Sequence, residues 1–154
     1  MTKAIRTQYL LVAAYTALGL ASGLFYREFT KFNGSPGGTQ LALVHTHWLA
    51  LGTILGLVFL LLEAQFQLSN LSKRWKAFVI TYNAGVLVTG AMMTVKGCLQ
   101  VVGNPFADSP MIAGISGLGH MSVTAGFVLL LLMLGSRIAV MDRLSAMETR
   151  RVDA

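Results

Sequence analysis

LALVHTHWLALGTILGLVFLLL, residues 41–62, is the stretch that decides the fold class of this chain. It belongs to a run from Phe32 to Leu62 that contains no Asp, Glu, Lys or Arg. A helix of about 20 such residues is about 30 Å long, which matches the hydrocarbon core of a bilayer. Its second half, Leu55–Leu62, lacks the polar stripe that a helix of a soluble bundle needs. The stretch therefore predicts a membrane-spanning helix.

Three other uncharged stretches are also long enough to cross a bilayer. With the first they make four predicted spans, near residues 9–26, 41–62, 77–95 and 112–134. The composition agrees, because only 12% of the 154 residues are charged, whereas soluble domains have about a quarter. We expect one all-α domain, a four-helix transmembrane bundle over residues 1–141, and a short cytoplasmic tail over residues 142–154.

The lysines and arginines divide unequally between the two sides of these spans. Nine lie on the side of both termini and the middle loop: Lys3, Arg6, Lys73, Arg74, Lys76, Arg137, Arg143, Arg150 and Arg151. Three lie on the other side: Arg27, Lys31 and Lys96. The positive-inside rule places both termini in the cytoplasm, with the chain as a multi-pass membrane protein. The net charge of +6 is then a topological signal, and nucleic acid is not an expected partner.

We expect the first span to be a retained helix rather than a cleaved signal peptide, because its apolar run continues to Tyr26.

All three histidines lie inside predicted spans, His45 and His47 on the second and His120 on the fourth. At 1.5 Å per residue His47 lies about 28 Å above Phe66 and His120 about 25 Å above Arg137, so they share one depth in the outer half of the membrane. An ionisable residue there is costly and suggests a functional site. Neutral imidazole is the commonest metal ligand. Residues two apart on a helix diverge by about 200°, so His45 and His47 would serve two different centres.

Haem b is the cofactor that this neighbourhood favours, because no carboxylate or cysteine accompanies the histidines at their depth. Gly52 and Gly56 share the helical stripe of His45 and would let a flat ring, or simply another helix, approach closely. Arg27 and Lys96 end the first and third spans and would pair with haem propionates, or else act as interfacial cations. Three methionines near this level offer soft ligands or core packing: Met92, Met93 and Met121.

Three runs carry a resemblance to a known family: GLFYREFTKFNG (23–34), VHTHWLALGT (44–53) and GLGHMSVTAG (117–126). Together they resemble a bacterial family of four-helix membrane proteins catalogued as a domain of unknown function, DUF2871. A more distant similarity is to the catalytic subunit of haem–copper oxidases, which is built from three four-helix arcs. In its third arc a His-x-His pair serves two haems on either side of one helix, as His45 and His47 would. The chain lacks the oxidase's adjacent His-His pair on the third helix. This resemblance implies three copies in a homotrimer.

The sequence thus predicts a membrane haem protein for electron transfer, redox sensing or small-gas binding. The candidate metal ligands are His45, His47 and His120. His120 would be either an axial ligand or a residue that supports a ligand without binding the iron itself. A copper or zinc protein of metal handling and a non-catalytic accessory protein are the alternatives. A haem-dependent oxidoreductase is compatible with these residues, whereas no nucleophile–base pair or phosphate-binding glycine loop points to a hydrolase or transferase. The redox partner is not specified.

Overall fold

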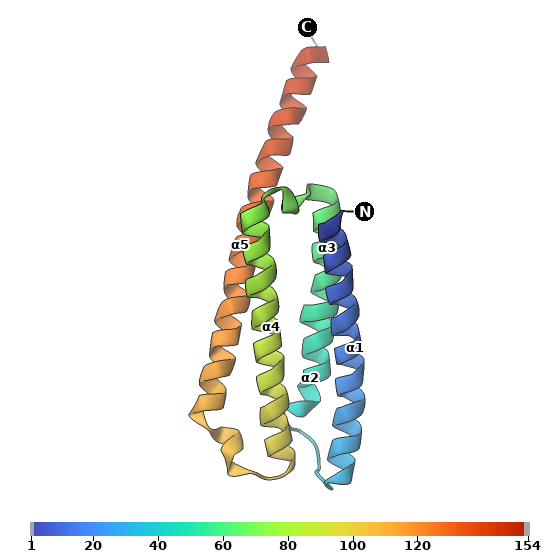
Figure 1. Ribbon diagram of the computed structural model, residues 1–154, viewed down its shortest axis with the longest axis vertical. Coiled ribbons are helices and arrows are strands. Elements are labelled where there is room, and N and C mark those ends of the chain that lie inside the picture. The colour runs from blue at the N-terminus through green and yellow to red at the C-terminus, as the bar shows by residue number, and fades with distance from the viewer. Residues whose placement is uncertain (1, 153–154) are drawn as a thin grey trace.

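The computed structural model describes residues 2–152, which form four long helices running up and down in succession (Figure 1). The first, third and fourth spans are single helices, and the second is built from three consecutive segments. The elements are α1 (Lys3–Phe32), α2 (Leu41–His47), the π-helix η1 (Trp48–Ile54), α3 (Leu55–Phe66), α4 (Ser72–Val101) and α5 (Pro110–Val152). Two short 3-10 turns, η2 (Leu68–Asn70) and η3 (Pro105–Asp108), join them.

All four predicted spans fall inside these helices, and the all-α prediction is confirmed. Each of the four is long and apolar enough to cross a membrane, with a mean hydropathy of 1.5 to 2.1 over its best window. The helices bury little of that window inside the chain, between 17% and 33%. Exposed leucines and methionines therefore cover the outside, as a lipid environment requires. The chain is a multi-pass membrane protein.

The two ends of the molecule differ in what they carry. Both termini and the α3–α4 turn lie at one end, and the α1–α2 and α4–α5 loops lie at the other (Figure 1). The nine lysines and arginines counted on one side of the predicted spans therefore lie at the end that carries the termini. That this end faces the cytoplasm stays a prediction. The predicted tail continues α5 as far as Val152, well beyond the other helices (Figure 1). Its last two residues, 153–154, lie outside the described residues.

The α3–α4 turn is fixed by buried polar contacts. Glu63 is only 2% exposed, and its carboxylate accepts hydrogen bonds from the backbone N–H of Ser69, at 2.9 Å, and from the Ser69 hydroxyl. Gln67 takes the left-handed conformation that ends α3, with φ at 51°. Arg137 of α5 donates to the Phe66 carbonyl at 2.7 Å. Glu63 therefore orders a turn between two spans.

The four helices pack in sequence order and leave the first and last as edges. α1 packs on the second span, the second span on α4, and α4 on α5. Over residues 2–152 there is no substantial interface between α1 and α5. α4 approaches both neighbours closely: a Cβ added at Gly97 would lie 2.2 Å from the backbone nitrogen of Leu41 in α2, and one at Gly85 would lie 2.6 Å from that of Val123 in α5. The predicted bundle is thus an open arrangement rather than a closed ring of helices.

Candidate histidine site

His47 faces α4, where it meets a buried threonine. Its Nε2 lies 2.8 Å from Oγ1 of Thr89, whose side chain is fully buried. The Thr89 hydroxyl also donates within its own helix, to the carbonyls of Gly85 at 2.9 Å and Val86 at 3.1 Å. Because a hydroxyl has a single proton, this arrangement leaves the Thr89 oxygen to accept from Nε2–H of His47. The other ring nitrogen, Nδ1, then carries the free lone pair.

His45 faces the opposite way, towards α1. A Cβ added at Gly23 would lie 3.6 Å from Cβ of His45, an ordinary van der Waals distance, so His45 packs on α1 at Gly23. The Nε2 atom is 3.3 Å from Oγ1 of Thr46. Nδ1 is buried and has no hydrogen-bond partner, and in the described part of the chain only Thr39 Oγ1 shares that condition. The two histidines therefore serve two different sides of the second span, as their spacing predicted.

His120 reaches the same level from α5. Its Nδ1 is 2.9 Å from the Ser116 carbonyl, and the side chain is otherwise exposed. The preceding residue, Gly119, packs on Thr89, since a Cβ there would lie 2.7 Å from Thr89 Cγ2. His47 and Gly119, the residue next to His120, thus both contact Thr89. The three histidines lie at one depth of the molecule.

A cavity of about 310 Å³ opens beside His120 between α4 and α5. Its lining includes Met92 and Lys96 from α4 and Ile112, Ser116 and His120 from α5. An imidazole, a thioether and an ammonium group therefore share one space. It lies near the end of the helices that carries the α1–α2 and α4–α5 loops, which we call the loop end. Neither His45 nor His47 lines this cavity.

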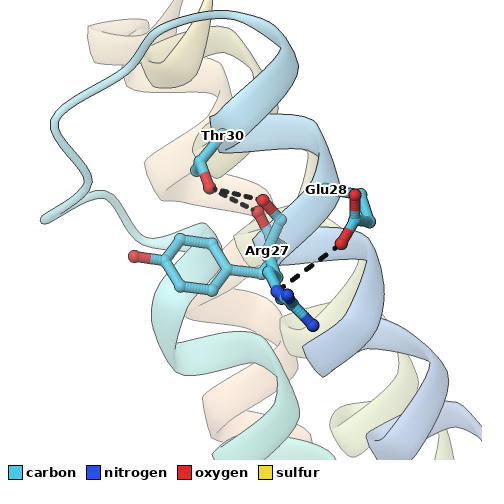
Figure 2. A network of polar contacts seen from close by, with 4 residues as sticks. Arg27, Glu28 and Thr30 are labelled. Atoms are coloured by element: carbon cyan, nitrogen blue, oxygen red, sulfur yellow. Dashed lines mark hydrogen bonds and ion pairs between the residues drawn. The ribbon is translucent and has the colours of Figure 1, made fainter.

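The two cations expected to hold propionates already have acidic neighbours. Arg27 Nε lies 3.6 Å from Glu28 Oε1 on α1, and its side chain is 75% exposed (Figure 2). Lys96 Nζ lies 3.9 Å from Asp108 Oδ1 and is 26% exposed. An exposed ion pair such as Arg27–Glu28 contributes little stability and opens readily. Of the two, only Lys96 shares a cavity with a histidine.

Gly52 and Gly56 face α1 on the same side as His45, as their spacing predicted. The space above them is occupied, because added Cβ atoms would lie 2.3 Å from Tyr15 and 2.7 Å from Val12. A flat ring has no room there. Of the two interpretations of these glycines, the contacts support close helix packing.

The sequence analysis missed the π-helix and the role of Thr89. The wide turn η1 begins at Trp48, directly after His47, and π-turns of this kind are frequent at functional sites. The Trp48 ring is buried over Gly90, where a Cβ would lie 2.4 Å from it, and it stacks on Tyr15 at 5.8 Å. The small residues around Thr89, in GVLVTG (85–90), were the available signal that another helix approaches at this point.

No three side chains of His, Cys, Asp or Glu come close enough to hold a metal ion together within residues 2–152. Cys98, the one cysteine of the chain, is free and lies near the end of α4. The donors that one chain offers are therefore single imidazoles at separate positions. Iron in a porphyrin needs only one or two such ligands from protein.

These helices and histidines define a multi-pass membrane protein with imidazole groups gathered at one depth. The chain belongs to the family described as "Protein of unknown function (DUF2871)", whose model matches residues 5–137. No curated protein and no solved structure matches the chain. The membership predicted from the three sequence runs is confirmed, and the similarity to haem–copper oxidases has no support from these comparisons.

Proposed function

We propose that this protein binds haem b in the loop-end half of the membrane, with His45 and His47 as ligands on two sides of the second span. The observation that carries the proposal is the Nδ1 atom of His45, which is buried without a partner. An unsatisfied buried polar atom costs about 1–3 kcal/mol, so it calls for an explanation such as a missing ligand. A bond to iron would remove that cost.

The arrangement around His47 supports the same function. Metal-ligating histidines almost always donate their other ring nitrogen to a neighbouring group, which fixes the tautomer and the ring orientation. Thr89 provides such a partner at 2.8 Å from Nε2. The buried position of the threonine keeps this contact away from solvent. His47 is therefore held ready to ligate through Nδ1.

Haem suits the donor set better than a bare ion does. A structural zinc site takes four N or S ligands, and the described part of one chain brings no three candidate ligands together. Haem b would supply a one-electron couple or a site for a small gas. This chain would supply the imidazoles and an apolar surrounding, and Lys96 or Arg27 would release an acidic neighbour to bind a propionate.

We further propose that the protein resides in the cytoplasmic membrane of a bacterium and forms a homotrimer. The unequal distribution of cations supports the orientation. The unpaired edge helices α1 and α5 support assembly, since each offers a whole face to a second copy. A contact between unlike edges is heterologous, and it forms a ring when the rotation between successive copies closes. The ring would place α1 of one chain, which lies on the His45 side of the second span, against α5 of the next, which lies on the His47 side.

Absorption spectra of the detergent-purified protein, oxidised and reduced, test the haem proposal. We expect a haem b spectrum that is lost or shifted in His45→Ala and in His47→Ala, and altered in His120→Ala. Leu43→Ala is the control, because Leu43 lies two residues before His45 on the same helix and is exposed. Full haem retention in the double variant His45→Ala/His47→Ala would refute the proposal.

A copper site is the second candidate, and the cavity beside His120 is the observation that favours it. Met92 and His120 line this cavity together, and thioether and imidazole are ligands that Cu(I) accepts. Elemental analysis of the purified protein separates the two candidates. Copper at one per chain without iron, lost in Met92→Leu, would replace the haem proposal. A protein with neither metal nor haem would be an accessory protein whose histidines only form hydrogen bonds.

A further inference from the structure

A second cavity, of about 440 Å³, lies at the opposite end of the molecule from the histidine cavity. It is formed between the start of α1 and the start of α4, near the chain's amino end (Figure 1). The proposed haem function uses none of its residues. Its lining residues are Thr2, Lys3, Ala4, Thr7, Ser69, Ser72, Trp75, Lys76, Val79 and Ile80.

The part of this cavity that extends along α4 is apolar. Trp75 is buried, Val79 is half-buried, and Ile80 is 67% exposed towards the outside of the helices. The surface therefore continues from a buried tryptophan to a lipid-facing isoleucine. An acyl chain lying along α4 would cover this strip.

The part at the helix ends is positively charged. Lys3 and Lys76 both line it, and no Asp or Glu is among the lining residues. The Ser69 hydroxyl is already donated to Glu63, whereas that of Ser72 has no hydrogen-bond partner among the described residues. Two helices also begin here, α1 at Lys3 and α4 at Ser72, and neither has an acidic residue in its first turn. The amino ends of both helices add their partial positive charge to that of the lysines.

We propose that this cavity binds an anionic phospholipid, with the phosphodiester between Lys3 and Lys76 and an acyl chain along Val79 and Ile80. The charge selects an anion, and the apolar strip selects a lipid over free phosphate. Basic pockets between membrane helices bind anionic head groups for the same electrostatic reason. The site is independent of the histidines, since it lies at the other end of the helices.

Native mass spectrometry in a neutral detergent tests the site with three probes: dioleoylphosphatidylglycerol, dioleoylphosphatidylcholine and inorganic phosphate. We expect one tightly held phosphatidylglycerol per chain, with at least tenfold weaker retention of phosphatidylcholine. The variant Lys3→Gln/Lys76→Gln should lose about tenfold or more in affinity for phosphatidylglycerol, because each lysine near a membrane surface contributes several-fold. The matched control is Lys73→Gln/Arg74→Gln, which removes the same charge from exposed residues outside the cavity.

A second variant examines the apolar strip. Val79→Asn keeps both lysines and should weaken phosphatidylglycerol retention, while thermal unfolding without lipid verifies that the variant folds. Equal losses in the cavity variant and the control variant would show a general surface charge effect and overturn the proposal. Equal retention of both lipids would also overturn it. Displacement of phosphatidylglycerol by millimolar phosphate would assign the site to free phosphate instead.

Discussion

At the scale of single residues, Thr89 decides how His47 is presented. Its side chain is fully buried, its hydroxyl donates to its own helix, and its oxygen lies 2.8 Å from the imidazole. Few other side chains fit this place, because α5 approaches the same point through Gly119. A threonine that satisfies its own proton locally can serve as a pure acceptor for the ring. This contact fixes one nitrogen of His47 and leaves the other available.

Thr89→Val tests that contact, because it removes the hydroxyl and keeps the shape of the side chain. The variant removes the hydrogen bond between Nε2 of His47 and Thr89, so we expect the free energy of unfolding to fall by about 0.5–1.5 kcal/mol, the usual net contribution of one hydrogen bond. Thermal unfolding in detergent measures the change. Thr94→Val is the matched control on the same helix, because the Thr94 hydroxyl bonds only to the carbonyl of Gly90, at 2.8 Å. Equal effects of the two variants would contradict the assigned role of Thr89.

At the scale of elements, the second span is unusual because its middle is a π-helix. The segment η1 places wide turns between the histidines and the glycines that pack on α1. A π-turn closes its hydrogen bond one residue later than an α-turn and so accommodates one extra residue. If the extra residue is taken up inside the segment, the residues on both sides of it keep the faces of a regular helix. His47 then contacts Thr89 of α4, and Gly52 lies under Tyr15 of α1, with the insertion between them absorbed by η1.

Deletion of Ala50 tests whether η1 holds one extra residue. We expect the shortened segment to become a regular α-helix in which the residues on both sides keep their faces, so the unfolding temperature should change little. Deletion of Leu60 in α3 is the control, because it rotates the following residues by about 100° and turns Glu63 away from Ser69. That variant should unfold at a much lower temperature or fail to accumulate. A deletion of Ala50 as harmful as that of Leu60 would show that the wide turn itself is required.

The sequence predicted the helices better than it predicted their contacts. Gaps between charges located all four spans because the bilayer excludes charge from about 20 residues at a time. The opposite directions of His45 and His47 followed from helix geometry alone. The π-helix had no such local signal, since it depends on Trp48 fitting over Gly90 of another span. The role of Thr89 likewise had no signal in the sequence, because it depends on the contact with His47 that forms only when α2 packs on α4.

At the scale of the whole molecule, we expect the two ends to differ in their accessibility to a reagent that cannot cross the membrane. The α1–α2 loop lies at one end, and the α3–α4 turn lies at the other with the termini (Figure 1). In a Cys98→Ser background, Pro36→Cys should react with a membrane-impermeant maleimide on intact cells. Lys73→Cys should react only after the membrane is opened, because the positive-inside rule predicts that the cation-rich end lies in the cytoplasm. Labelling of position 73 but not of position 36 in intact cells would reverse the orientation.

Assembly also belongs to the scale of the whole molecule, because the edge helices α1 and α5 each have a face that no other helix of the chain covers. Gly117 of α5 lies three residues from His120, and an added Cβ there would meet no atom within 4 Å in the chain. A leucine there points into open space at its Cβ, beside the cavity of His120 that Gly117 also lines, and it would hinder a second copy packed on this face. We expect native mass spectrometry to show a trimer with one haem per chain for the unmodified protein and mostly monomer for Gly117→Leu.

Gly135→Leu is the control. It lies 18 residues after Gly117, which is five full turns, so it is on the same face about 27 Å further along the helix, with the same open space. Because the ligands shared between chains would lie in the outer half only, the control should remain a trimer. A monomer of the unmodified protein that retains haem would refute the shared-ligand trimer and leave His120 with one histidine of the second span as the ligand pair.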